Sequence, residues 1–191
     1  MAQDLGVMLK RYGVLREGHF LLTSGKHSDR YFEKFRILEQ PPVCEAFAKA
    51  VAERFSRDGA TVVCGPTTGG IIIAYEVARQ LGCRCVIAEK ADMGRKIGRG
   101  FRLGPEDRVL VVDDVLTTGG SIKETLAAVE PSGAKVIGVG VYVDRSAGVD
   151  FGVPLFGAFR QQVATFEPST CPLCAKGVPL EEPGRSGKPR G

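Results

Sequence analysis

The chain has 191 residues, of which 43% are hydrophobic and 25% charged, the composition of an ordinary globular protein. A chain of this length fits one domain and can bury a core without disulfide bonds. The net charge of +4 is too small to indicate a nucleic-acid-binding surface, but it suits an anionic small-molecule substrate. Residues 1–13 lack the long apolar run of a signal peptide, and no run reaches the about 18 residues of a membrane span. We therefore expect a cytoplasmic protein with no nucleic-acid or membrane partner.

The first part of the chain mixes helical and extended patterns. Residues 5–16 are amphipathic with helical spacing, residues 18–25 mix short apolar runs with turn formers, and residues 31–38 have the pattern of a strand. Helical spacing returns over residues 43–57, after two prolines.

From residue 61 the chain repeats a strand, a glycine-rich loop and a helix. The expected elements are a strand at 61–64, a loop at 65–70, a helix at 71–81, strands at 85–88 and 109–112, a loop at 113–120, a helix at 121–129 and a strand at 135–143. Apolar strands that alternate with helices indicate an α/β fold, with a central, mostly parallel sheet flanked by helices.

The strongest chemical signal is the pair Asp113 and Asp114, which follows an apolar strand and precedes Thr117–Ser121. Ligands of open α/β sheets bind at the carboxyl ends of the strands, where this pair is expected. Ionised carboxylates accept hydrogen bonds from vicinal hydroxyls, and glycine amides at a helix N-terminus bind phosphate. The pattern therefore predicts a site for a phosphorylated ribose; the alternative is a turn with a glycine-rich helix cap.

A second loop, residues 65–70, occupies the same strand–loop–helix position but contains no acid. Alone it fits either a tight turn or an anion site. Beside the first loop it favours a second phosphate site, so that the two loops together match a sugar with phosphate groups at both ends.

The sequence VLVVDDVLTTGGS, residues 109–121, resembles the signature with which type I phosphoribosyltransferases bind phosphoribosyl pyrophosphate (PRPP). The resemblance implies that Asp113 and Asp114 hold the ribose hydroxyls and act in catalysis. The PRPP site that it implies also includes Val115, Leu116, Thr117, Thr118, Gly119, Gly120 and Ser121. The pyrophosphate loop that it implies consists of Pro66, Thr67, Thr68 and Gly69. Some family members have a lysine where Gly69 stands.

Within that family, residues 5–182 resemble the orotate phosphoribosyltransferases. Residues 18–28 resemble their N-terminal hood, a small cover over the active site. Tyr31, Phe32 and Thr117 fall where that family contacts orotate.

Arg145 also falls where the family positions an arginine for orotate. Physical chemistry agrees, because orotate is an acidic planar pyrimidine and a guanidinium can donate two parallel hydrogen bonds to a carboxylate. The alternative is a surface ion pair with Asp144 or Asp150.

Residues 89–102 form a glycine-punctuated basic insertion, which is typical of an active-site lid. Its cations are candidates for neutralising pyrophosphate as it leaves, and the resemblance implies catalytic roles for Lys90, Arg95 and Lys96. Arg99 is a further cation of the insertion, and the pattern does not distinguish which cation reaches the reacting centre. The alternative is a solvated basic hairpin.

The C-terminal part contains Cys171 and Cys174 in a CxxC motif. A zinc site normally needs four ligands, and the two histidines of the chain, His19 and His27, lie far upstream in the sequence. We therefore predict no metal site, and assign the cysteines to a structural pair or a dimer interface.

The resemblance implies one domain over residues 1–182, with a core at about 41–149, a hood from about 1–40 and 150–182, and a disordered tail at 183–191. It implies Mg²⁺-dependent transfer of the phosphoribosyl group from PRPP to orotate in pyrimidine biosynthesis. It also implies a homodimer in which each lid covers the partner's site. Two alternatives stay open: a phosphoribosyltransferase for another base such as a purine, and a PRPP-sensing regulator.

Overall fold

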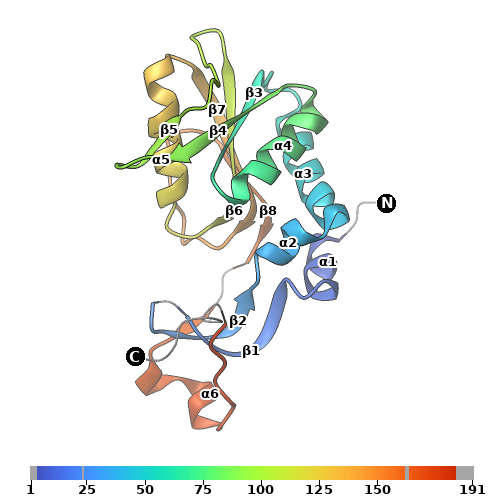
Figure 1. Ribbon diagram of the computed structural model, residues 1–191. Coiled ribbons are helices and arrows are strands. Elements are labelled where there is room, and N and C mark those ends of the chain that lie inside the picture. Colours follow the sequence, from blue (N-terminus) through green and yellow to red (C-terminus); the bar gives the residue numbers. More distant parts are fainter. Residues whose placement is uncertain (1–3, 23, 162–163, 184–191) are drawn as a thin grey trace.

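Two sheets of unequal size organise the molecule, shown in a computed structural model that describes residues 4–22, 24–161 and 164–183 (Figure 1). The larger sheet and its helices form the core. The smaller sheet forms a lobe at one end, where N-terminal strands (blue) meet C-terminal segments (red). Within the described ranges, no helix combines the length and apolarity that crossing a membrane requires.

The core sheet has the strand order β5-β4-β3-β6-β7-β8. Its strands are β3 (Val62–Pro66), β4 (Arg84–Lys90), β5 (Arg95–Ile97), β6 (Arg108–Leu116), β7 (Lys135–Asp144) and β8 (Leu155–Arg160). All neighbours pair in parallel except β4 and β5, which form an antiparallel hairpin. The predicted α/β fold with a mostly parallel sheet is confirmed.

Helices cover both faces of this sheet. On one face lie α3 (Pro41–Phe55) and α4 (Gly69–Leu81), and on the other lies α5 (Gly120–Val129), followed by the short helix η1 (Glu130–Ser132). The side chains of β6 alternate between these faces, since Leu110 and Val112 pack in the α3/α4 cluster while Val109 and Val111 pack in the α5 cluster.

Glycine in β7 lets α3 approach the sheet closely. A Cβ atom on Gly140 would lie 2.5 Å from a methyl carbon of Val51, and one on Gly138 would lie 2.5 Å from the ring of Phe55. A side chain at either of these two positions would push α3 outward, whereas Tyr142, further along the same face, packs against Phe47 of α3.

The lobe is a three-stranded sheet of order β1-β2-β9. Its elements are β1 (Leu15–Leu21), β2 (His27–Phe32), β9 (Thr165–Phe166), the short helix η2 (Pro168–Thr170) and α6 (Pro172–Ala175). The β1/β2 hairpin joins β9 through only two residue pairs. Two helices beside it, α1 (Leu5–Arg11) and α2 (Phe35–Glu39), pack on the core through Leu9 and Ile37.

Two predicted elements differ from the structure. The helix expected over residues 5–16 ends at Arg11, because Gly13 takes a left-handed conformation with φ of 64° before β1 begins. The strand expected over residues 31–38 is wrong beyond Phe32. A strand would turn Phe35 and Ile37 to the same face, whereas α2 buries Ile37 and leaves Phe35 57% exposed.

The hood is smaller than predicted. β8, which was expected within a hood of residues 150–182, pairs with β7 and extends the core sheet because Phe156 and Phe159 pack against the core cluster. Residues 184–191 of the predicted disordered tail lie outside the described residues.

Candidate active site

The two acids lie together near the carboxyl end of β6. Asp113 is 7% exposed and Asp114 is 5% exposed, so both are largely withdrawn from water. The Oδ1 atom of Asp113 accepts a hydrogen bond from the Asp114 amide at 2.8 Å, and Asp114 Oδ1 accepts one from the Val115 amide at 2.6 Å. Lys34, which the sequence analysis did not single out, reaches Asp114 Oδ2 with its Nζ at 3.0 Å.

Burial makes Asp113 difficult to ionise. Loss of water raises the pKa of Asp113 to about 6, and the charge of Asp114 adds to the effect. Each carboxylate needs hydrogen-bond donors or cations to be stable in this position. Ribose hydroxyls are such donors, and they can approach from the loop side.

The loop of the predicted PRPP site, residues 115–121, leads directly into α5. Thr117 and Thr118 are exposed, and Gly119 caps the helix with a left-handed φ of 80°. A Cβ atom on Gly119 would lie 2.9 Å from the ring of Phe151, so glycine is required twice, for conformation and for space. The first amides of α5 are then available to bind an anion.

The predicted pyrophosphate loop runs from Pro66, at the end of β3, to Gly69, at the start of α4. Its Thr67–Thr68 peptide is cis. A Cβ atom on Gly69 would lie 2.7 Å from Asp114 Oδ2. The two predicted loops therefore meet, and their close approach depends on the glycine at position 69.

Arg95 connects the two loops. Its Nη1 donates to the carbonyl oxygen of Thr67 at 3.2 Å and to the Thr67 hydroxyl at 3.1 Å. Its Nη2 lies 3.4 Å from the Ser121 hydroxyl, and its Nε lies 3.3 Å from Glu124 Oε2. The side chain is only 8% exposed, so this cation belongs to the interior of its own chain's site.

The other cations of the predicted lid are arranged differently. The segment is a hairpin of β4 and β5, and Lys90 and Lys96 are exposed on it. Arg99 pairs with Glu89. The structure thus separates one buried arginine from two exposed lysines, a distinction that the basic pattern alone could not make.

Arg145 follows β7 and stacks on the lobe. Its guanidinium carbon lies 5.1 Å from the centre of the Phe32 ring, and its backbone amide donates to Leu116 O at 2.9 Å, next to Thr117. Loss of water lowers the pKa of Arg145, an effect that the neighbouring Tyr31 opposes. Its Nε is buried and has no hydrogen-bond partner among the described residues.

The alternative ion pairs of Arg145 are not formed. Asp144 binds Arg160 at 3.2 Å and accepts hydrogen bonds from Ser146, and Asp150 accepts one from the Gly152 amide at 2.8 Å. Arg145 is left as a partly buried cation beside an aromatic ring, which is suited to a planar anion.

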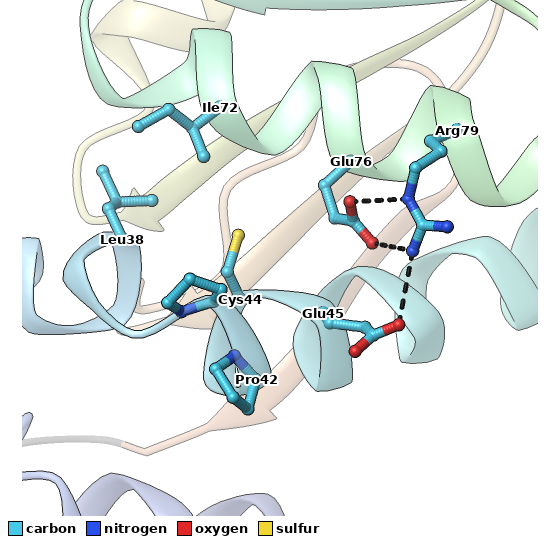
Figure 2. Close-up of a pocket in the computed structure, with 8 residues that line it drawn as sticks. Leu38, Pro42, Cys44, Glu45, Ile72, Glu76 and Arg79 are labelled. Atoms are coloured by element: carbon cyan, nitrogen blue, oxygen red, sulfur yellow. Dashed lines mark hydrogen bonds and ion pairs between the residues drawn. The ribbon is translucent and has the colours of Figure 1, made fainter.

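A cavity of about 320 Å³ between α2, α3 and α4 is distinct from this site (Figure 2). Leu38, Cys44 and Ile72 line it, and at its edge Arg79 bridges Glu45 and Glu76. Neither Asp113 nor Asp114 lines it.

The reason for predicting no metal site does not hold in three dimensions. The folded chain brings His19 and His27 to Cys171 and Cys174, and one potential ligand atom from each lies within 4.8 Å of all the others. Distance along the sequence was a poor guide because the lobe is built from both parts of the chain.

Comparison with known proteins agrees with this geometry. Residues 36–152 match the phosphoribosyl transferase domain family. An orotate phosphoribosyltransferase of Caldanaerobacter subterraneus subsp. tengcongensis is 49% identical over 178 residues, which covers 93% of this chain and 94% of the relative. One of Thermotoga maritima is 42% identical over 181 residues, or 94% of this chain and 97% of the relative.

Solved structures give the same result. The crystal structure of orotate phosphoribosyltransferase from Aeropyrum pernix matches with a TM-score of 0.72 and 28% identity, over 82% of this chain and 93% of that one. Adenine phosphoribosyltransferase from Thermoanaerobacter pseudethanolicus shares the fold, with a TM-score of 0.58 and 18% identity over 69% of this chain and 88% of that one. With paired acids between two glycine-rich loops, and with relatives that match nearly its whole length, this chain belongs to the orotate phosphoribosyltransferase family of type I phosphoribosyltransferases.

Proposed function

We propose that this chain transfers the 5-phosphoribosyl group of PRPP to orotate, giving orotidine 5′-monophosphate and pyrophosphate in the biosynthesis of UMP. The observation that carries the choice of orotate is Arg145, a partly buried guanidinium over Phe32 whose Nε has no partner among the described residues. An anionic planar base would supply both the missing acceptor and a surface for stacking.

In the proposed reaction a ring nitrogen of orotate attacks C1 of the ribose. The bond from C1 to the pyrophosphate oxygen breaks, and its electron pair leaves with pyrophosphate. Positive charge develops on the sugar and negative charge on the leaving group, so groups arranged in advance around both can lower the barrier.

Each part of the site has a role in this scheme. Asp113 and Asp114 accept hydrogen bonds from the ribose hydroxyls, and their charge stabilises the developing cation. The amides at the start of α5 hold the 5′-phosphate. Arg95, beside Thr67, faces the pyrophosphate. No covalent intermediate with the protein is required.

The acids also suit Mg²⁺, which prefers oxygen ligands and keeps several of its own waters. Asp113 and Asp114 are the residues that would hold the ion together with bound PRPP. When bound, the ion neutralises charge on the pyrophosphate.

A purine phosphoribosyltransferase is the main alternative, because the fold alone is shared with adenine-specific enzymes. Adenine carries no carboxylate, so it would leave the Arg145 charge without a counter-ion, and this favours orotate. A PRPP-binding regulator is a third possibility, and it would bind PRPP without turnover.

One assay distinguishes these proposals. The protein is incubated with PRPP, Mg²⁺ and each base in turn, while orotate absorbance and pyrophosphate release are followed. We expect turnover with orotate and little with adenine, hypoxanthine or guanine. Turnover with a purine alone, or PRPP binding with no turnover of any base, would contradict the proposal.

We further propose that the chain acts as a homodimer with shared sites, in the cytoplasm. Six free cysteines suit a reducing compartment. Four large apolar side chains are exposed on α2 and α4, two helices in contact with each other: Phe35, Ile71, Ile72 and Tyr75. Their exposure supports a self-association surface in this region. The exposed lysines Lys90 and Lys96 are the cations that can serve a partner's site.

Subunit exchange tests the shared site. One inactive variant lacks the acids (D113N/D114N), and the other lacks the exposed lysines (K90A/K96A). After mixing, half of the dimers are mixed and each has one intact site, so roughly a quarter of all sites should recover activity. No recovery, with exchange verified by light scattering of differently sized fusions, would contradict sharing.

A further inference from the structure

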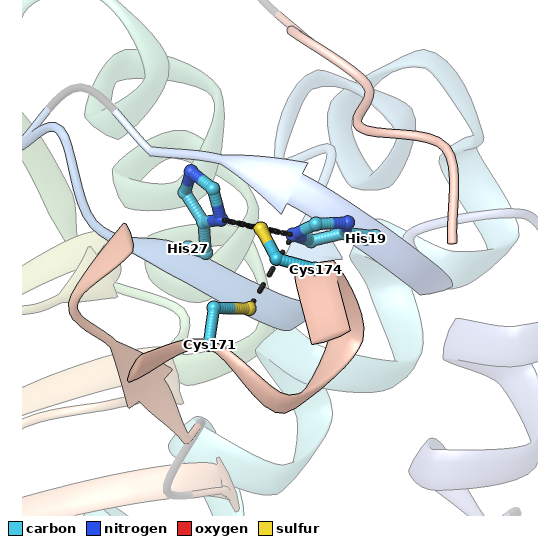
Figure 3. Close-up of side chains that lie close together, drawn as sticks. All are labelled: His19, His27, Cys171 and Cys174. Atoms are coloured by element: carbon cyan, nitrogen blue, oxygen red, sulfur yellow. Dashed lines mark hydrogen bonds between the residues drawn. The ribbon is translucent and has the colours of Figure 1, made fainter. Parts of the chain in front are cut away.

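A cluster of two histidines and two cysteines lies in the lobe, outside the active site just described. His19 comes from β1, His27 from β2, and Cys171 and Cys174 flank the start of α6. Their ligand atoms point toward one another (Figure 3), all within 4.8 Å. Two imidazoles and two thiols without a carboxylate are a ligand set typical of zinc and unsuited to magnesium.

Four of the six spacings between the ligand atoms are close to those around zinc, and the other two lie within 4.8 Å. Bonds of about 2.3 Å to sulfur and about 2.0–2.1 Å to nitrogen place tetrahedral ligands roughly 3.3–3.8 Å apart. Cys174 Sγ lies 3.3 Å from His27 Nδ1 and 3.8 Å from His19 Nε2, and Cys171 Sγ lies 3.5 Å from His19 Nε2. The two histidine nitrogens, at 2.9 Å, need to separate by only a few tenths of an ångström to admit an ion.

A hydrogen bond prepares His19 for this role. Its Nδ1 donates to the carbonyl oxygen of Val178 at 2.8 Å, which leaves Nε2 with a lone pair directed at the cluster. Histidine ligands of metals are commonly held by such a bond from the other ring nitrogen.

Burial indicates a structural site. His19 is 2% exposed, His27 6% and Cys171 3%, while Cys174 closes the outer side. Four protein ligands complete a tetrahedral shell, so no position remains for a substrate.

Leu15 and Phe32 pack the lobe onto the main core cluster, but the lobe has little apolar packing of its own among the described residues. Phe20 is its one large fully buried apolar side chain among the described residues, and it belongs to neither hydrophobic cluster of the molecule. The pairing of β2 with β9 covers two residue pairs, and backbone hydrogen bonds at Glu181 add a short connection to β1. Small folds with so little core often use a metal or disulfide instead.

We propose that His19, His27, Cys171 and Cys174 bind one Zn²⁺ ion, which fastens the C-terminal segment to the β1/β2 hairpin. The ion replaces the proton shared between the two histidines, and both cysteines bind as thiolates after releasing their protons. This site is independent of the reaction proposed above.

Metal content is the first test. Protein without a histidine tag, purified under reducing conditions and without added metal, should contain about one zinc per chain by elemental analysis. The C171S/C174S variant should contain almost none. The matched control C83S/C85S changes two cysteines of the core strand region and should keep its zinc. Equal zinc in both variants, or no zinc in the wild-type protein after growth with added zinc, would overturn the proposal.

Cobalt replacement keeps the test decisive if the double variant does not fold. Wild-type protein loaded with Co²⁺ should show the intense visible bands of a tetrahedral ion and a sulfur-to-cobalt charge-transfer band. H19Q should alter these bands without abolishing the sulfur signal. A spectrum of six-coordinate cobalt, or a Cys171–Cys174 disulfide found by mass spectrometry in protein kept anaerobic, would show that the cluster is not a metal site.

Discussion

The active site of the core and the lobe bring polar side chains together in different ways. In the active site, Asp113 and Asp114 are adjacent in the sequence, and the central strand β6 positions them near its carboxyl end, supported by a large hydrophobic core. In the lobe, four ligands from two distant parts of the chain meet with little apolar packing around them. The core would keep its shape without its ligands, whereas the lobe depends on the group that its side chains hold.

The largest difference between the lobe and the core is expected when zinc is removed. A chelator that strips the ion should increase amide hydrogen exchange in β1, β2 and α6 by more than about tenfold, because metal binding contributes folding free energy directly. Exchange in α3 and β6 should stay unchanged. Equal amide hydrogen exchange in the lobe before and after zinc removal would contradict a dependence of the lobe on the ion.

The next largest effect is expected from Asp114→Asn. A hydrogen bond from a ribose hydroxyl to a charged acceptor contributes about 1.5–3 kcal/mol, so kcat/KM for PRPP should fall about ten- to a hundredfold. Steady-state kinetics measures this, with circular dichroism to verify the fold. The control is Glu53→Gln, at an exposed position of α3 that belongs to neither loop of the site. Matching kinetics of the two variants would exclude the role of Asp114.

Arg145→Lys tests the contact between core and lobe in which Arg145 stacks on Phe32. Lysine keeps the charge but loses the planar fork, so KM for orotate should rise about tenfold while KM for PRPP changes little. Isothermal titration with each ligand provides an independent measure. Equal losses for both ligands would locate Arg145 outside the base pocket.

The smallest of the expected changes is in stability: Asp113→Asn should increase the free energy of unfolding. The pKa of Asp113 is raised from 3.8 to about 6, so the folded protein holds a proton that the unfolded chain releases. Wild-type stability from this group is therefore present below about pH 4 and lost as the pH rises through about 6. The ligand-free variant should exceed the wild type by about 1–2 kcal/mol at pH 7.5 and by much less at pH 4.

Denaturant unfolding at the two pH values measures this difference. Glu53→Gln again serves as the control, because that side chain is exposed. A stability difference that does not depend on pH would show that Asp113 is not the titrating group.

The sequence predicted best what is local. The residues of the signature, 109–121, form a strand, a loop and a helix start within one contiguous stretch, so their relative positions follow from the chain itself. The helix expected at 71–81 is confirmed as α4, extended by two glycines at its start. The family resemblance assigned Arg145 and Phe32 separately to contact with orotate, and the structure brings these two side chains together.

What the sequence missed depends on contacts between distant segments. Lys34 reaches Asp114 only because α2 follows the lobe into the core, and no motif marks it. The basic pattern of residues 89–102 treated Arg95 like its neighbours, although the sheet buries it between two loops. The histidine–cysteine cluster was rejected because sequence separation was taken for spatial separation.

The stacking of Arg145 on Phe32 has a mechanical consequence. Arg145 follows the end of β7 in the core, and Phe32 lies at the end of β2 in the lobe. The proposed orotate site therefore spans the contact between the core and the lobe. A ligand that binds only when Arg145 and Phe32 face each other favours the orientation of the lobe in which they do so. By thermodynamic reciprocity, an interaction that restrains the lobe in that orientation increases the affinity for the base. The factor is the same as that by which base binding favours the orientation. In the binding mode proposed above, the lobe would form one wall of the orotate pocket, so a change in its position would change the affinity for the base.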